Sequence, residues 1–176
     1  MKRIFLVLFC VSFIHLQAQE ESVLDDYSAN HELKVNGLFL VIGAFDVTYE
    51  HLLNEESGLG INVFLPYDSE IKDDINYYIS PYYRFYFGNK YAAGFFLEGF
   101  GMLNSVNQQE FFGFDVAPAE ETYTDFALGI GLGGKWVTKG GFVGELSLGV
   151  GRNLFNSNES MEEFVAKLGI TLGYRF

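Results

Sequence analysis

The sequence has 176 residues, which suits a single domain, and a formal net charge of −12, which argues against a nucleic-acid partner. It contains 20 glycines, 19 phenylalanines and 11 tyrosines but only 3 prolines. This combination is unusual for an ordinary globular domain. It suits strands that bend tightly and carry aromatic residues at a membrane interface.

Residues 1–19 have the pattern of a secretory signal peptide. Two basic residues precede an apolar run, Ile4 to Ile14, and small and polar residues follow it. We expect cleavage near residues 18–19, so that Cys10 is removed and no disulfide can form. The acidic residues 20–32 show no sustained period and are predicted to be a short periplasmic lead-in.

Residues 33–176 contain eight segments in which apolar residues alternate with polar or small ones. A period of two places the two kinds of side chain on opposite faces of a strand. Each segment is close to the roughly 9–11 residues with which a tilted strand crosses a bilayer. In chain order the segments are residues 33–42, 45–53, 58–65, 76–87, 92–103, 123–137, 142–151 and 164–176.

The connections between these segments alternate in length. The short ones lie near residues 54–57, 88–91 and 138–141, and the long ones are residues 66–75, 104–122 and 152–163. An even number of strands with short turns on one side is typical of an outer-membrane barrel, whose short turns are periplasmic. We therefore predict an all-β fold, an eight-stranded antiparallel up-and-down transmembrane β-barrel. The very short connection around Gly43 departs from this rhythm.

Strand parity places charged residues of both signs on the predicted inner face. An eight-stranded barrel is just wide enough for its own side chains, and charges buried there must pair or hydrogen-bond. We interpret the set as a structural salt-bridge network, with a narrow gated ion path as an alternative. Its members are Glu50, Arg84, Glu98, Lys135, Glu145, Lys167 and Arg175.

The sequence offers no evident catalytic, cofactor-binding or metal-binding set. Apart from the signal peptide, the histidines are His31 in the lead-in and His51 on the lipid-facing side of its strand. Some outer-membrane lipid hydrolases pair a histidine with a serine, but only the turn residue Ser57 stands near His51. Two histidines without a cysteine argue against a zinc site. We expect a non-enzymatic protein without cofactor or metal, and keep an outer-membrane lipid-modifying enzyme as an alternative.

Several short motifs are rich in aromatic residues and glycine. They are residues 82–88, 94–99, 133–136 and 173–176. They resemble the small outer-membrane β-barrels of unknown function of Bacteroidetes-type bacteria, which look like OmpA-type or OmpX-type eight-stranded barrels. The resemblance spans residues 33–176 and carries no known activity. It implies that Tyr174 and Phe176 form the C-terminal aromatic signal read by the outer-membrane insertion machinery.

These patterns predict a location in the cell outer membrane. We expect outer-membrane lipid, lipopolysaccharide and the insertion machinery as partners, and a structural or surface-interaction role through the acidic loops 66–75, 104–122 and 152–163. The acidic residues in these loops match no defined calcium-binding loop. Parity alone does not decide which face of each strand points inward. A soluble periplasmic lipocalin-like barrel that binds an apolar ligand inside is therefore the main alternative.

Overall fold

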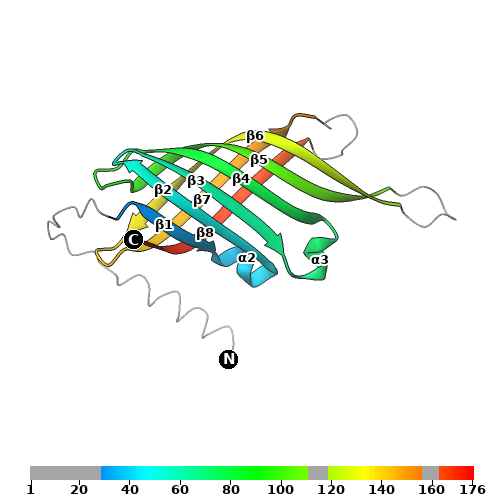
Figure 1. Ribbon diagram of the computed structural model, residues 1–176, viewed down its shortest axis with the longest axis horizontal. Helices are drawn as coiled ribbons and strands as arrows, with labels where there is room; N and C mark the ends of the chain where they lie inside the picture. Colours follow the sequence, from blue (N-terminus) through cyan, green and yellow to red (C-terminus); the bar gives the residue numbers. More distant parts are fainter. Residues whose placement is uncertain (1–28, 111–118, 156–162) are drawn as a thin grey trace, which may run out of the picture.

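The computed structural model describes residues 29–110, 119–155 and 163–176. Eight antiparallel strands follow one another around a closed barrel in chain order, and the first pairs with the last (Figure 1). This confirms the predicted eight-stranded up-and-down barrel. The strands are β1 (His31–Asn36), β2 (Ala44–Asn54), β3 (Ser57–Pro66), β4 (Ile75–Tyr86), β5 (Gly94–Glu110), β6 (Ala119–Val137), β7 (Phe142–Asn153) and β8 (Phe164–Arg175).

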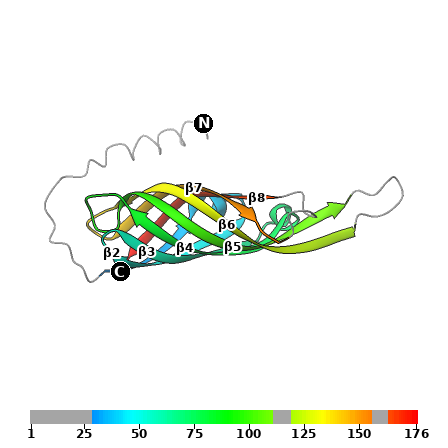
Figure 2. The same ribbon diagram turned by 90° about the horizontal axis from the view of Figure 1, so that it is seen from above.

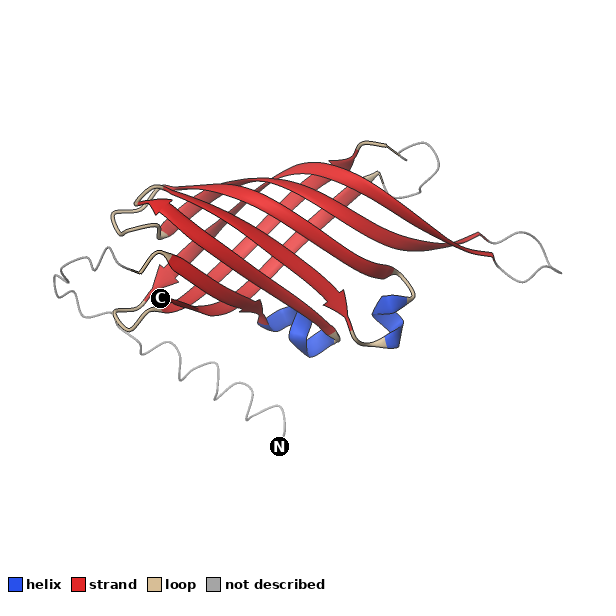
Figure 3. Ribbon diagram, in the orientation of Figure 1, coloured by secondary structure: helices blue, strands red, loops and turns tan. Residues whose placement is uncertain are grey.

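The two ends of the barrel differ (Figure 3). The three hairpin turns, the start of β1 and the end of β8 lie at one end, which we call the short-turn end. The opposite end, the loop end, carries the short helices α2 (Gly37–Ile42) and α3 (Ser69–Lys72). In the described part of the chain neither helix is long and apolar enough to cross a membrane.

The first predicted strand, residues 33–42, is wrong in its second half, because residues 37–42 form α2. The side chain of Asn36 accepts a hydrogen bond from the backbone N–H of Leu38 at 3.2 Å and so caps the helix. Gly43, with φ of 119°, ends it and donates its N–H to the carbonyl of Phe39 at 3.0 Å. The helix therefore makes the connection that looked too short for an outer loop. The strand itself begins at His31, two residues earlier than predicted.

The long connection predicted at residues 104–122 is largely strand. β5 and β6 keep pairing beyond the rest of the barrel, out to Glu110 opposite Ala119, and form a projecting two-stranded ribbon (Figure 2). Residues 111–118 and 156–162, and with them most of the loop 152–163, lie outside the described residues. So do residues 1–28, which contain the predicted signal peptide and most of the lead-in.

The outer wall of the barrel is apolar on all eight strands, and the inner wall carries the buried charged and polar residues together with buried aromatic ones. Ile130 and Trp136 are 72% and 59% exposed, whereas Lys34 and Lys135 are 0% and 1% exposed. The lipocalin-like alternative required the opposite arrangement and is wrong, because the charged faces point inward. Aromatic residues concentrate on the outer wall toward the short-turn end: Tyr83, Phe85, Phe95, Trp136, Phe142, Tyr174 and Phe176.

Bulky and small residues of neighbouring strands fit together on the inner wall. Buried aromatic side chains come from β3, β4 and β5, and those of β5 lie against their glycine register partners on the adjacent β6. A Cβ atom at Gly129 would lie 2.3 Å from the ring of Phe100, and one at Gly133 would lie 2.5 Å from the ring of Phe96. The packing leaves a lumen cavity of about 30 Å³, roughly the space of one water molecule.

Candidate functional site

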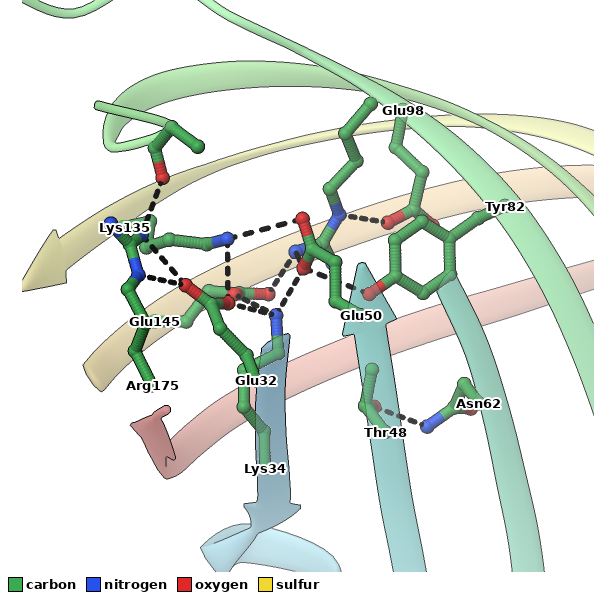
Figure 4. Close-up of polar contacts among 12 residues, drawn as sticks. Glu32, Lys34, Thr48, Glu50, Asn62, Tyr82, Glu98, Lys135, Glu145 and Arg175 are labelled. Carbon is green, nitrogen blue, oxygen red and sulfur yellow. Dashed lines mark hydrogen bonds and ion pairs between the residues drawn. The ribbon is translucent and has the colours of Figure 1, made fainter. Parts of the chain in front are cut away.

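Nine charged side chains fill the lumen toward the short-turn end, and we call them the lumen charge network; Figure 4 labels most of them. Four are carboxylates and five are cations, and most are almost inaccessible to solvent. The members are Glu32, Lys34, Glu50, Arg84, Glu98, Lys135, Glu145, Lys167 and Arg175.

Glu50, on β2, is the centre of the network. Its carboxylate forms an ion pair with Lys34 and lies 3.2 Å from Lys135 Nζ and 3.2 Å from Arg84 Nη1. The hydroxyl of Tyr82 donates to it at 3.0 Å, and the hydroxyl of Tyr86 donates to its other oxygen. Both carboxylate oxygens are therefore satisfied without water, although the side chain is completely buried.

Arg84, on β4, connects three carboxylates from three other strands. Its guanidinium lies 2.7 Å from Glu98 and 2.8 Å from Glu145, in addition to the contact with Glu50. The planar group also lies over the rings of Tyr82 and Phe96, 4.4 Å and 4.2 Å from their centroids. A delocalised cation suits this mixed position, because it can donate in its plane and stack on its faces.

The network ends in two different ways. At the short-turn end Glu32 lies 2.7 Å from Arg175, whose guanidinium also donates to the backbone carbonyls of Tyr91 and Ala92 in the β4–β5 turn at 2.9 Å and 3.0 Å. Toward the loop end Glu98 lies 2.7 Å from Lys167. The network thus runs from a hairpin turn to the middle of the lumen and closes the barrel over that length.

The structure places all seven predicted lumen residues on the inner face and joins each to at least one opposite charge. Glu32 and Lys34 complete the set, and sequence reasoning missed both. The signal was present, because Glu32 and Lys34 alternate with the apolar Leu33 and Val35. The predicted strand began after Glu32, and it put Lys34 on one face with the apolar residues 38, 40 and 42, which belong to α2. Lys135 and Glu145 are opposite in the β6–β7 register, yet the ammonium of Lys135 reaches Glu32 at 2.8 Å and Glu50 at 3.2 Å across the lumen.

Beyond the network, toward the loop end, the lumen holds a second polar group that we call the amide layer: Asn36, Asp46, Thr48, Asn62 and Tyr78. Asp46 accepts from Asn36 Nδ2 at 2.9 Å, from Asn62 Nδ2 and from the hydroxyl of Tyr78 at 3.4 Å. Asn62 Nδ2 also donates to Thr48 Oγ1 at 2.8 Å. Among the described residues, Asn62 Oδ1 is buried without a hydrogen-bond partner. All five residues line the cavity.

The two histidines of the described ranges lie on the outer wall, away from both groups. His31 and His51 are opposite in the β1–β2 register, with ring centroids 4.7 Å apart, and Tyr49 hydrogen-bonds His31 Nδ1 at 2.7 Å. His51 Nδ1 and Ser57 Oγ are both buried without a partner in the described chain, so these two atoms do not activate each other. No group of three or more histidine, cysteine or acidic residues in the described ranges could hold a metal ion.

Comparisons with known proteins support the fold. The model of a family described as "Protein of unknown function (DUF3575)" matches residues 4–167. The N-terminal β-barrel domain of Pseudomonas aeruginosa OprF is similar in structure, with a TM-score of 0.56 and 16% identity over 84% of this chain and 98% of that one. The Yersinia pestis outer membrane protein Ail covers 85% of this chain and 100% of its own at 14% identity, with a TM-score of 0.41. No curated protein matches the sequence.

Proposed function

The chain belongs to the DUF3575 family of proteins of unknown function, and from that premise we propose that this member is a non-enzymatic outer-membrane protein whose barrel crosses the bilayer. The observation that carries the proposal is the inside-out distribution of side chains. Large apolar residues cover the outside of every strand, and charged residues fill the inside. In water such an outer wall would be a very large exposed apolar surface, whereas in a bilayer it is the lipid contact.

A passive structural barrel fits the lumen better than a pore does. The four network carboxylates each lie within 3.2 Å of a cation, and the cavity of about 30 Å³ beyond them has room for little more than one water molecule. Wide aqueous channels need about 16 strands. An ion path through this lumen would require several buried pairs to separate together, which is costly.

The loop end supplies the surface that we propose for interactions. The connection 66–75 carries α3, and four acidic residues lie in or beside this helix with Lys72 as the only basic residue: Asp68, Glu70, Asp73 and Asp74. The β5–β6 ribbon projects farther than this connection (Figure 2). We propose surface partners for these acidic loops, lipopolysaccharide against the outer wall beside them, and recognition of the outward-facing Tyr174 and Phe176 by the insertion machinery at the other end.

The membrane placement can be tested on cell envelopes. The envelopes are extracted with sarkosyl, and the insoluble fraction is run on a gel with and without boiling. We expect the protein in the insoluble fraction and a band that migrates faster without boiling, because a folded barrel resists detergent. A band in the soluble periplasmic fraction, with the same mobility in both lanes, would overturn the proposal.

A further inference from the structure

Arg152 is the basic residue on the outer wall of the barrel. Of the nine lysines and arginines in the described part of the chain, five belong to the lumen charge network, Lys90 and Lys139 lie in the short turns, and Lys72 lies in α3. Arg152 alone among them projects outward from a strand, where it is 61% exposed. A cation in this position needs a reason, because the surrounding wall is apolar.

Arg152 lies at the edge of that wall nearest the loop end. It is opposite Leu128 of β6 and Phe164 of β8, and its pair with Phe164 is the last of the β7–β8 register toward the loop end. One row closer to the middle of the barrel, Val150 is opposite Ile130. Arg152 therefore lies on the last β7–β8 rung of the wall, the level that we assign to lipid headgroups in the proposed placement.

A shallow, open depression of about 410 Å³, which we call the groove, lies on the outer wall beside Arg152. Its side walls are apolar and well exposed, and its charged end is the guanidinium. The lining residues are Leu128, Gly129, Ile130, Val150, Gly151, Arg152 and Phe164. An apolar slot with one cation at its headgroup end matches a lipid whose chain lies in the slot and whose anionic group meets the cation.

The charge of Arg152 is available to such a lipid. Its guanidinium forms an ion pair with Glu163, which is itself 42% exposed. An exposed pair of this kind contributes little, because water and salt screen it. The guanidinium has five N–H donors, and one carboxylate cannot use them all. A phosphate can therefore join the pair or replace Glu163, with bidentate geometry that suits arginine.

From this geometry we propose that the groove below Arg152 is a binding site for a phosphate-bearing lipid, with Glu163 as the carboxylate that the phosphate competes against. The acidic residues around α3 would repel an anionic headgroup, whereas Arg152 on β7 offers one a direct contact. The proposal rests on the proposed membrane placement, because the groove faces lipid only in that placement.

The test uses the full chain folded in neutral detergent and bisphosphorylated lipid A as the probe, with dephosphorylated lipid A as the comparison. Native mass spectrometry gives the fraction of barrel that retains each lipid. Arg152→Gln should lower retention of the phosphorylated lipid about three- to tenfold and leave the dephosphorylated lipid unchanged. Glu163→Gln should raise retention of the phosphorylated lipid. Lys72→Gln, which removes the other cation of the loop end, is the matched control and should change neither.

Three results would overturn the proposal. If the wild type and Arg152→Gln retain the phosphorylated lipid equally, Arg152 does not form the site. If Lys72→Gln lowers retention as much as Arg152→Gln does, the loss is a general effect of charge. Complete displacement of the lipid by millimolar inorganic phosphate reassigns the site to a soluble anion. The same samples are also mixed with lipid vesicles and run boiled and unboiled. If the protein inserts into vesicles and migrates faster unboiled, but the Arg152→Gln variant retains as much lipid as the wild type, the site alone is refuted. If the wild type fails to insert, the membrane placement and the site are refuted together.

Discussion

The two halves of the lumen stabilise their buried carboxylates in different ways. Toward the short-turn end, the charge network pairs carboxylates with cations, as when Glu50 meets Lys34, Arg84 and Lys135. Toward the loop end, Asp46 is held by neutral donors from Asn36, Asn62 and Tyr78. The same eight strands enclose both halves, so the difference comes from the side chains alone.

The comparison shows which half of the lumen depends closely on each of its side chains and which half tolerates substitutions. In the charge network each group depends on several others, so removing one leaves partners buried without compensation. In the amide layer Asn62 Oδ1 already lacks a partner, and a cavity of about 30 Å³ lies beside it. Four members of the charge network line the same cavity, so the two groups meet there: Arg84, Glu98, Glu145 and Lys167. We therefore expect the short-turn half to carry the stability and the loop half to absorb changes.

The largest expected effect is that of Glu50→Gln. The substitution leaves three carboxylates for five cations in the network and removes the charge that faces Lys34, Arg84 and Lys135. Breaking a buried ion network on one side costs about 3–5 kcal/mol. The free energy of unfolding should fall by that amount, as measured by equilibrium urea unfolding of the barrel in lipid vesicles.

Asp46→Asn is the matched substitution in the amide layer. It also removes one buried carboxylate, but the partners that remain are neutral. The loss should be smaller, about 1.5–3 kcal/mol, the range for hydrogen bonds to a charged group. Equal losses for the two variants would contradict the division of the lumen into a tightly determined and a tolerant half.

Substitutions at two glycines of β8 test the same comparison through side-chain packing. A Cβ atom at Gly173 would lie 2.3 Å from the carbonyl oxygen of Leu33 and 2.5 Å from Cγ of the buried Lys34. A Cβ atom at Gly169 would meet the Ser147 hydroxyl at 2.4 Å, and a hydroxyl can rotate away toward the cavity that both residues line. Gly173→Ala should therefore lower the free energy of unfolding by about 1–3 kcal/mol. Gly169→Ala should lower it clearly less.

Gly144→Ala serves as the control for these two substitutions, since a Cβ atom there meets nothing within 4 Å. Its unfolding free energy in the same vesicle assay should match that of the wild type. If Gly169→Ala proved as damaging as Gly173→Ala, the cavity would not provide the tolerance that we attribute to it.

Much of this division could be predicted from the sequence, because strand parity is a local property. Alternation separated Glu50, Arg84, Lys135 and Glu145 from the apolar face of each strand, and the predicted transmembrane barrel put this charged face inside. Parity also placed Tyr82 and Tyr86 on the face of Arg84, although the interpretation singled out only the charges. Their hydroxyls both reach Glu50, which a reading of the aromatic residues on that face could have suggested.

What could not be predicted depends on three-dimensional stagger. The strands tilt around the barrel, so side chains meet partners several strands away, as Lys135 meets Glu32. No local pattern carries that information. The prediction of the first strand was wrong for a different reason. Leu38, Leu40 and Ile42 continue the alternation of a strand, but the side chain of Asn36 caps a helix there, and this local hydrogen bond decides against the β ladder.

The smallest expected effect is that of Thr48→Val in the amide layer. The substitution keeps the shape of the side chain and removes only the hydroxyl that accepts from Asn62 Nδ2 at 2.8 Å. Asn62 Nδ2 still donates to Asp46, and a water molecule in the adjacent cavity could take the place of the hydroxyl. The loss of one neutral hydrogen bond with a substitute at hand should cost less than about 1 kcal/mol in the same unfolding assay. A loss approaching that of Glu50→Gln would mean that the amide layer is coupled as tightly as the charge network, and that the barrel is sealed along its whole length rather than in one half.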